Sequence, residues 1–413
     1  MLRCTRSRIA GLMLLAAAEG GAAEPVSVAL NVPMSGPFAA IGELYAKNSQ
    51  FIVDGINARG GVLGGRPLRL VVLDNRNSPQ EALLALRRAT DDGVPFLIQS
   101  GGSHIAVPLA EAIEKHNERE PGKRMLFLNE PGDQELTQEK CSFWTFTFHP
   151  NAESKMMGLT DYLAVRKEVK RVYLINQDYV FGQQMRAFAR EMLSRKRPDI
   201  EIVGDELHPL GKVKDFNPYV AKIRASGADA VVTGNWGPDI TLLVRAAAEA
   251  GLPAAFYTYY GMGPGAPTAM GPAAADKVKV LWRWHPNLAF ADEKAAAEAY
   301  KRRFGLEYYS MPLNNLFAML VAAIGKAGTT EAVQVGRALE GMRIRNSMGE
   351  AWMRPADHQL FEPLYVVGIT RVDGGEVRHP LEGTTLGTRT ESMIEAGAMV
   401  LPTRCKMKRP DLH

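Results

Sequence analysis

The residues best suited to binding chemistry in this 413-residue chain form the run Ser-Gly-Gly-Ser-His at positions 100–104. The run follows an apolar stretch and precedes a helical pattern, so it predicts a loop between a strand and a helix. Glycines expose the backbone N–H groups of such a loop, and the start of a helix attracts negative charge. We therefore expect Gly102, Ser103 and His104 to help bind an anionic group. Ser103 could also cap the helix, and the two roles are compatible.

Other polar runs suggest catalysis or cofactor binding, but each has a simpler interpretation. Ser103 and His104 are neighbours at a helix start, so their side chains diverge and make a poor nucleophile–base pair. The run Gly-x-Gly-x-Gly at 261–265 resembles a dinucleotide loop, yet prolines replace amides that would bind phosphate, and it comes late in its unit. Asp-His-Gln at 357–359 favours structural hydrogen bonding. With no HExxH, CxxC or Walker A motif, we expect a non-enzymatic protein without metal or cofactor.

Short apolar strands alternate with amphipathic helices along the chain, which predicts parallel sheets covered by helices on both faces. The first unit is expected to contain strands at 26–33, 68–73, 95–99 and 125–128 and helices at 38–58, 79–91 and 103–117. The second is expected to contain strands at 172–176, 200–207, 230–233 and 255–259 and helices at 152–166, 181–193, 218–226 and 239–250. Ligands of such sheets bind beyond the carboxyl ends of the strands, so two facing units would enclose a cleft.

The remaining elements predict how the two units are joined. A strand at 278–284 leads to helices at 292–304, 313–325 and 331–339, and 351–378 is strand-like. We expect an α/β protein of two doubly wound, Rossmann-like lobes joined by a hinge that the chain crosses several times. The expected division is lobe 1 at 24–148 plus 281–345, lobe 2 at 149–280 plus 346–385, and a tail at 386–413 returning to lobe 1.

The first 23 residues are typical of a cleaved secretory signal. Arg3, Arg6 and Arg8 precede an apolar run at 9–18, and the pair Ala22-Ala23 suits a signal peptidase. The run is much shorter than the roughly 20 residues that a membrane span needs. We expect a mature chain that begins near Glu24 and is exported to the periplasm; an uncleaved anchor or a buried N-terminal helix is the alternative.

Composition describes a globular protein with few cysteines. Apolar residues make up 46% of the chain and charged residues 23%, and removal of the leader lowers the net charge from +4 to +2. So small a charge does not predict a nucleic-acid partner. The mature chain keeps Cys141 and Cys405, an even pair that suggests a disulfide in an oxidising compartment, with two buried free thiols as the alternative.

Several runs in order resemble the type I periplasmic binding proteins, specifically the leucine/isoleucine/valine-binding family of ABC importers. The resemblance covers most of residues 25 to 370. It rests on Met-Ser-Gly-Pro at 34–37, Asp-Gly-Ile-Asn-Ala-Arg-Gly-Gly at 54–61, Asp-Asn at 74–75, the loop at 100–103, Glu-Leu-Thr at 135–137, Asp-Tyr-Val-Phe-Gly at 178–182 and the run at 245–252. It implies a monomeric, two-lobed receptor that closes on a small solute and docks on the membrane permease.

The resemblance also implies site residues. Ser103 falls where the family holds a ligand carboxylate with a hydroxyl and neighbouring amides. Glu130 and Gly132 fall at further contact positions, where Glu130 either holds a ligand cation or is a solvated loop residue. Phe181 and Trp236 match aromatic walls of the second lobe, with ordinary core packing as the alternative; Tyr179 and Phe38 are weaker candidates.

One position departs from the family pattern. Amino-acid-binding members place a Glu that pairs with the ligand ammonium where this chain has Tyr260. A phenol cannot neutralise a buried ammonium, so either Glu130 takes that role or the ligand has no ammonium. We expect a substrate-binding protein of an ABC importer for an amino acid or a small aromatic or aliphatic carboxylate. A ligand sensor of the same fold is the alternative.

Overall fold

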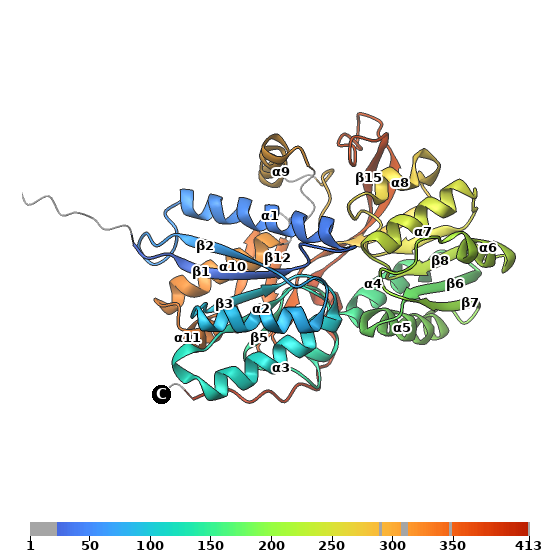
Figure 1. Ribbon diagram of the computed structural model, residues 1–413. Helices are drawn as coiled ribbons and strands as arrows, with labels where there is room; N and C mark the ends of the chain where they lie inside the picture. Colours follow the sequence, from blue (N-terminus) through green and yellow to red (C-terminus); the bar gives the residue numbers. More distant parts are fainter. Residues whose placement is uncertain (1–22, 289–290, 307–312, 347–348, 412–413) are drawn as a thin grey trace, which may run out of the picture.

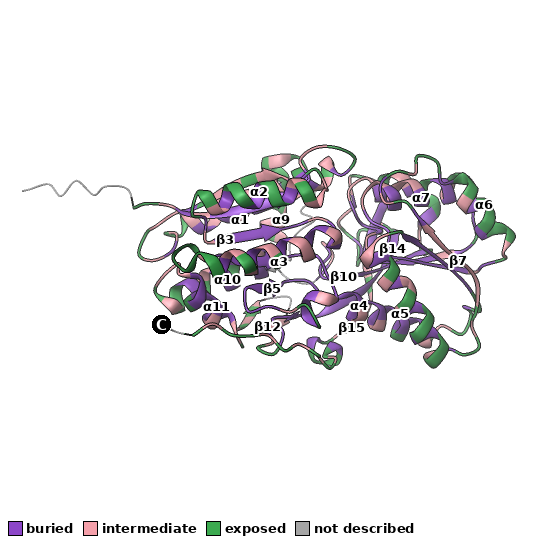
Figure 2. Ribbon diagram, turned by 60° about the horizontal axis from the view of Figure 1, so that its bottom comes forward, coloured by how far each residue is buried: buried purple, intermediate pink, exposed green. Residues whose placement is uncertain are grey.

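The computed structural model describes residues 23–288, 291–306, 313–346 and 349–411. Two α/β lobes lie side by side (Figure 1), which confirms the predicted fold class. Buried strands occupy the middle of each lobe, and exposed helix faces form the outside (Figure 2). Residues 1–22 of the expected leader lie outside the described residues.

The first lobe contains a five-stranded parallel sheet in the order β2-β1-β3-β4-β5. Its strands are β1 (Val26–Val32), β2 (Leu68–Asp74), β3 (Phe96–Gln99), β4 (Leu126–Asn129) and β5 (Thr145–Thr147). Its helices are α1 (Ala39–Ala58), α2 (Pro79–Asp91), α3 (Ser103–Arg119), α10 (Leu313–Ala327) and α11 (Ala332–Leu339). β3 and β4 are buried along their whole length, as expected for central strands covered on both faces. Among the described residues, no single helix is long and apolar enough to cross a membrane; α10 and α11 meet that test only together, as a pair bent by 115°.

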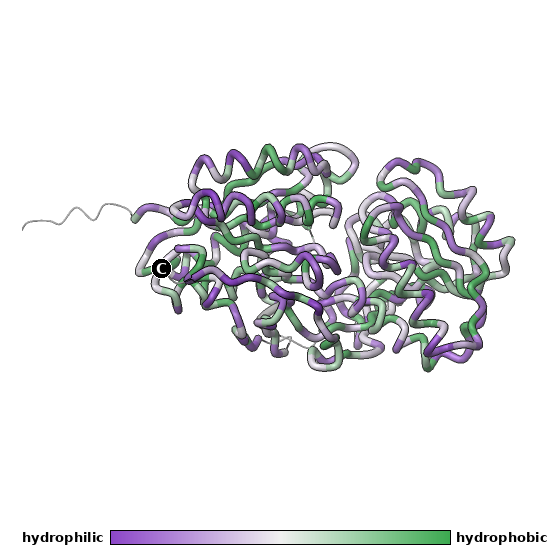
Figure 3. The backbone as a smooth tube through the Cα atoms, turned by 90° about the horizontal axis from the view of Figure 1, so that it is seen from below, coloured by the Kyte–Doolittle hydropathy of each residue, from purple (hydrophilic) through white to green (hydrophobic). Residues whose placement is uncertain are grey.

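The second lobe contains a seven-stranded sheet in the order β15-β14-β10-β9-β8-β6-β7. Its strands are β6 (Arg171–Gln177), β7 (Glu201–His208), β8 (Ala230–Thr233), β9 (Ala255–Thr258), β10 (Val278–Trp282), β14 (Leu364–Arg371) and β15 (Leu386–Ile394). Its helices are α4 (Ala152–Ala164), α5 (Val180–Lys196), α6 (Asn217–Ala225), α7 (Pro238–Glu249) and α8 (Ala266–Met270), while α9 (Ala291–Phe304) follows β10. The strands from β7 to β10 run parallel, and β14 and β15 add antiparallel strands at one edge. Hydrophobic and hydrophilic stretches alternate along the chain in both lobes (Figure 3).

Two segments of the division expected from the sequence lie elsewhere in the structure. The small antiparallel sheet β11 (Arg343–Asn346), β12 (Gly349–Met353) and β13 (Leu360–Phe361) contributes Ala351, Met353 and Leu360 to the core of the first lobe rather than the second. Residues 386–394 form β15 of the second sheet rather than the beginning of the returning tail. β15 carries polar residues because an edge strand has an exposed side, and that polarity made it resemble a tail.

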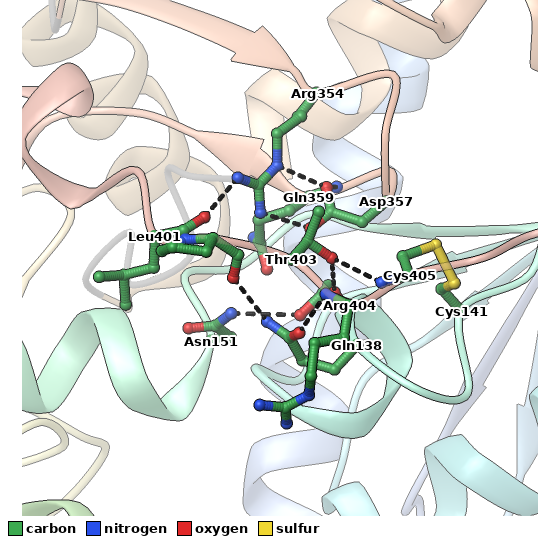
Figure 4. Close-up of polar contacts among 12 residues, drawn as sticks. Gln138, Cys141, Asn151, Arg354, Asp357, Gln359, Leu401, Thr403, Arg404 and Cys405 are labelled. Atoms are coloured by element: carbon green, nitrogen blue, oxygen red, sulfur yellow. Dashed lines mark hydrogen bonds and ion pairs between the residues drawn. A yellow bond between two sulfur atoms is a disulfide. The ribbon is translucent and has the colours of Figure 1, made fainter.

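Beyond β15 the chain returns to the first lobe, where a disulfide holds it. Cys141 and Cys405 are bonded, with their Cα atoms 5.6 Å apart. Hydrogen bonds flank the bridge: Arg354 donates to the Leu401 carbonyl oxygen over 2.6 Å, and the Thr403 hydroxyl donates to the Thr137 carbonyl oxygen over 2.9 Å (Figure 4). We call residues 400–411 the C-terminal strap. The predicted disulfide is therefore present.

Candidate ligand-binding site

A cavity of about 50 Å³ lies between the two lobes, several times larger than the roughly 10–15 Å³ that one water needs. Its walls are loops and helix starts that follow β1, β3 and β4 in the first lobe and β6, β8 and β9 in the second. Both sheets thus direct their carboxyl ends at the cavity, as open α/β sheets do. The lining residues are Ile41, Tyr45, Ser100, Gly101, Ser103, Glu130, Pro131, Gly132, Tyr179, Phe181, Trp236, Gly237, Tyr260 and Gly263.

Most residues predicted from the sequence gather around this cavity. Those that line it are Ser103, Glu130, Gly132, Tyr179, Phe181, Trp236 and Tyr260. Gly102, His104 and Phe38 stand just behind the wall: the His104 ring meets Tyr179 edge-on at 5.7 Å, and the Phe38 ring lies 4.5 Å from Trp236. As ligand contacts, all of these residues remain a proposal.

The start of α3 forms a polar end of the cavity. Gly102 is the N-cap residue and Ser103 is the first helical residue, with no side-chain cap bond, so Ser103 does not cap the helix. The first N–H groups of a helix lack partners within it. The buried Ser100 hydroxyl beside them has no hydrogen-bond partner among the described residues. A Cβ at Gly102 would lie 2.3 Å from the His104 ring, so a larger residue at this position would displace that ring.

Aromatic contacts join the lobes above the cavity. Within the second lobe, the Trp236 indole N–H donates to the Tyr179 hydroxyl oxygen over 2.8 Å. The Trp236 ring also packs against the ring of Phe38 from the first lobe. Phe38 also packs against the backbone of Gly211 and Gly237, where a Cβ would lie 2.7 Å from the ring. The lobes therefore touch each other at the cavity rim, which describes a closed arrangement.

Glu130 is a buried carboxylate with two partners, so the interpretation of a solvated loop residue is wrong. The Tyr45 hydroxyl donates to one of its oxygens over 3.0 Å, and Arg283 donates to the other over 3.2 Å. Burial raises the pKa of Glu130 to about 7, against the lowering effect of Arg283 and Lys155. Both carboxylate oxygens of Glu130 therefore already accept a hydrogen bond from the protein.

Arg283 links Glu130 to the places where the chain crosses between the lobes. Besides Glu130, its guanidinium donates to Glu362, in the crossing between β13 and β14, and over 2.7 Å to the carbonyl oxygen of Phe148, in the crossing after β5. Arg283 itself belongs to the crossing after β10. The buried guanidinium of Arg283 thus connects three crossings between the lobes with Glu130 in the cavity wall.

Lys155 of α4 lies behind the second-lobe wall. Its ammonium group donates to the Tyr260 hydroxyl over 3.1 Å and lies 5.0 Å from the centre of the Phe181 ring. Burial lowers the pKa of Lys155 well below its usual value, partly opposed by Glu130. Sequence reasoning missed Lys155 because nothing near it in the sequence marks a site.

The polar runs set aside at first have structural roles. His104 hydrogen-bonds to the Asn77 carbonyl oxygen over 3.1 Å, and no bond joins it to the Ser103 hydroxyl. His358 stacks on Phe146 with ring centroids 3.9 Å apart and contacts Glu340 over 3.1 Å. In the described ranges, no group of three or more His, Cys, Asp or Glu residues could hold a metal ion.

Comparison with known proteins agrees with this architecture. Residues 25–376 match the sequence profile described as "Periplasmic binding protein". The chain belongs to this family. It is 32% identical over 413 residues to "Leu/Ile/Val-binding protein homolog 4" of Brucella abortus (strain 2308), with 96% of each chain covered.

Solved structures extend the comparison of this periplasmic binding protein. The closed conformation of the leucine-, isoleucine-, valine-, threonine- and alanine-binding protein from Brucella ovis superposes with a TM-score of 0.82 at 31% identity, covering 94% of this chain and all of that one. A solute-binding protein of an ABC transporter from Rhodopseudomonas palustris BisB5, solved with 3,4-dihydroxybenzoic acid, has a TM-score of 0.77 at 18% identity, covering 90% of this chain and 98% of that one. The second likeness shows the fold alone.

Proposed function

We propose that this chain is the periplasmic substrate-binding component of an ABC importer and binds a small carboxylate between its lobes. The observation that carries the proposal is the cavity between the lobes. Its walls come from the carboxyl ends of both sheets, and its first-lobe end combines the start of α3 with the Ser100 and Ser103 hydroxyls. Backbone N–H groups at a helix start favour a carboxylate. Its relative at 32% identity is named a Leu/Ile/Val-binding protein homologue, which supports the same solute class.

Three further parts of the proposal follow from the family. The chain acts as a carrier rather than an enzyme, works as a monomer with the transmembrane permease subunits of its importer, and reaches the periplasm after removal of residues 1–23. Mass spectrometry of the exported protein tests the leader directly: we expect the mature chain to begin near Glu24.

A thermal-shift screen of the purified mature protein tests the ligand class. The panel pairs branched-chain and aromatic amino acids with their deaminated acids, and adds aromatic acids and amides. A bound ligand raises the apparent stability by about 2.7 kcal/mol at a concentration of 100 times its Kd. We expect carboxylates to raise the melting temperature and amides to leave it unchanged.

The pattern of shifts decides between ligand types. Stabilisation by amino acids alone assigns the ammonium to Glu130. Stabilisation by acids without an amine fits Tyr260, which stands where the family's amino-acid binders place a Glu. If amides stabilise as strongly as acids, a carboxylate-binding site is contradicted.

A further inference from the structure

Lys155 is buried without a carboxylate partner. Its side chain is 3% exposed, and among the described residues no carboxylate oxygen lies within ion-pair distance of its ammonium nitrogen. Glu130 is the carboxylate that acts on the pKa of Lys155, but it already accepts hydrogen bonds from Arg283 and Tyr45. The rings of Phe181 and Tyr260, at 5.0 and 5.3 Å, attract the cation but do not neutralise it. An unpaired buried charge is costly, which is why burial lowers the pKa of Lys155, and an acceptor brought by a ligand would favour the charged form.

The ammonium determines what Tyr260 can do. A lysine ammonium has donors only, so the Tyr260 oxygen accepts the hydrogen bond from Lys155 over 3.1 Å. The phenolic hydrogen of Tyr260 is then left to donate, and no acceptor for it is found in the described part of the chain. Tyr260 lines the cavity. The free O–H of this tyrosine, polarised by the cation behind it, is therefore available to a ligand.

Resting on the proposed function, we propose that Lys155 and Tyr260 form a second polar pole of the cavity. This pole selects a carboxylate ligand that carries a further hydrogen-bond acceptor, such as a second carboxylate, a hydroxyl or a keto oxygen. The first carboxylate binds at the start of α3 in the first lobe, and the further acceptor binds on the second-lobe wall. An ammonium group at this pole would meet a donor backed by a like charge, and is disfavoured.

Calorimetric titration of matched ligand pairs tests the proposal on the full mature protein. The first pair is 4-hydroxybenzoate and 4-methylbenzoate, and the second is glutarate and 5-methylhexanoate; in each pair, apolar atoms replace the further acceptor in nearly the same shape. We expect the wild type to bind the acceptor member of at least one pair tenfold or more tightly. Tyr260→Phe and Lys155→Met should bring that ratio close to one.

Tyr259→Phe is the matched control. Tyr259 is the neighbouring buried tyrosine, its hydroxyl contacts the Met156 sulfur at 3.8 Å, and it does not line the cavity. This variant should keep the wild-type ratio. If Lys155→Met does not fold, the test rests on Tyr260→Phe alone. That variant removes only the hydroxyl oxygen and keeps the ring, so it should still fold.

The outcomes distinguish a failure of the second pole from a failure of the proposed function. A wild type that binds carboxylates but shows equal affinities within both pairs, or a ratio that survives in Tyr260→Phe, overturns the second pole while leaving the proposed function in place. A wild type that binds no carboxylate in these titrations or in the thermal-shift screen overturns the proposed function, and the second pole with it.

Discussion

At the scale of single residues, Ser103 is the sharpest test of the first-lobe end of the cavity. Its hydroxyl belongs to the cavity wall and makes no cap bond in α3. A hydrogen bond to a charged group contributes about 1.5–3 kcal/mol, so Ser103→Ala should weaken carboxylate binding by roughly 10- to 150-fold, as titration calorimetry would show. The melting temperature of the unliganded protein should change little. Ser194→Ala, on the exposed face of α5, is the control and should bind like the wild type.

Glu130 predicts a pH dependence of stability. Its pKa is raised from 4.5 to about 7 by burial. Between about pH 4.5 and 7 the unfolded chain loses this proton and the folded chain keeps it, so the free energy of unfolding falls as pH rises through that window. One pKa unit corresponds to about 1.36 kcal/mol, so the loss amounts to about 3 kcal/mol.

Denaturant unfolding of the wild type and Glu130→Gln at several pH values measures this effect. The difference between the two proteins isolates Glu130, because burial also raises the pKa of Asp133 to about 7 and this residue titrates in both. We expect the variant to gain stability relative to the wild type from pH 5 to pH 8. Parallel curves across that range would show that Glu130 has an ordinary pKa.

Sequence reasoning found residues that sit in recognisable loops and missed those placed by packing. Ser103 and Trp236 follow strands directly, so the rule for open α/β sheets points to them. Tyr45 reaches the cavity from the second turn of α1. Lys155 reaches Tyr260 from α4, which is far from Tyr260 in the sequence. Their neighbours in the sequence carry no sign of the site, because only the tertiary fold brings these residues together.

At the scale of elements, Arg283 should hold the hinge together. Its guanidinium is shared by the carboxylates of Glu130 and Glu362, all three residues being buried. Removing one partner of a buried ion pair typically costs 3–5 kcal/mol because the other charge stays buried. Arg283→Met should therefore lower the free energy of unfolding by about 3–5 kcal/mol in denaturant titration.

An exposed arginine gives the comparison for this variant. Arg303 of α9 pairs with Asp54 of α1 over 2.6 Å, with side chains that are 46% and 38% exposed. Exposed pairs contribute about 0–1 kcal/mol, so Arg303→Met should stay within that range. Equal losses in the two arginine variants would mean that the hinge network contributes no more than a surface pair.

The elements themselves were largely predictable, and the exceptions have a physical cause. Strands such as β3 and β4 are short apolar runs, and their helices show a clear amphipathic period, so the residues determine both. β15 was missed because an edge strand exposes one side and carries polar residues there. β12 and β13 were assigned to the second lobe although they pack on the first, since their position depends on contacts such as the bridge between Thr147 and Gln359.

At the scale of the whole molecule, the described parts of the chain pass between the lobes after β5, β10, β13 and β15. The last passage differs from the others because a covalent bond fixes its far end. After β15 the chain contacts α4, where the Ser154 hydroxyl donates to the Met399 carbonyl oxygen, and it continues as the strap, which is bonded to the first lobe at Cys405. Ligand-driven closure by a hinge motion must therefore take place with both ends of this strap held.

The disulfide should stabilise the fold without entering the binding site. It joins residues 264 positions apart, and chain-entropy models give about 5 kcal/mol for loops of that order. The double variant Cys141→Ala/Cys405→Ala should therefore melt at a lower temperature than the oxidised wild type in a thermal scan. Its ligand affinity should stay within about twofold, because none of the strap residues lines the cavity. Reductant should lower the melting temperature of the wild type alone, since the mature variant has no cysteine left; equal melting temperatures for the oxidised and reduced wild type would mean that the bridge does not form in solution.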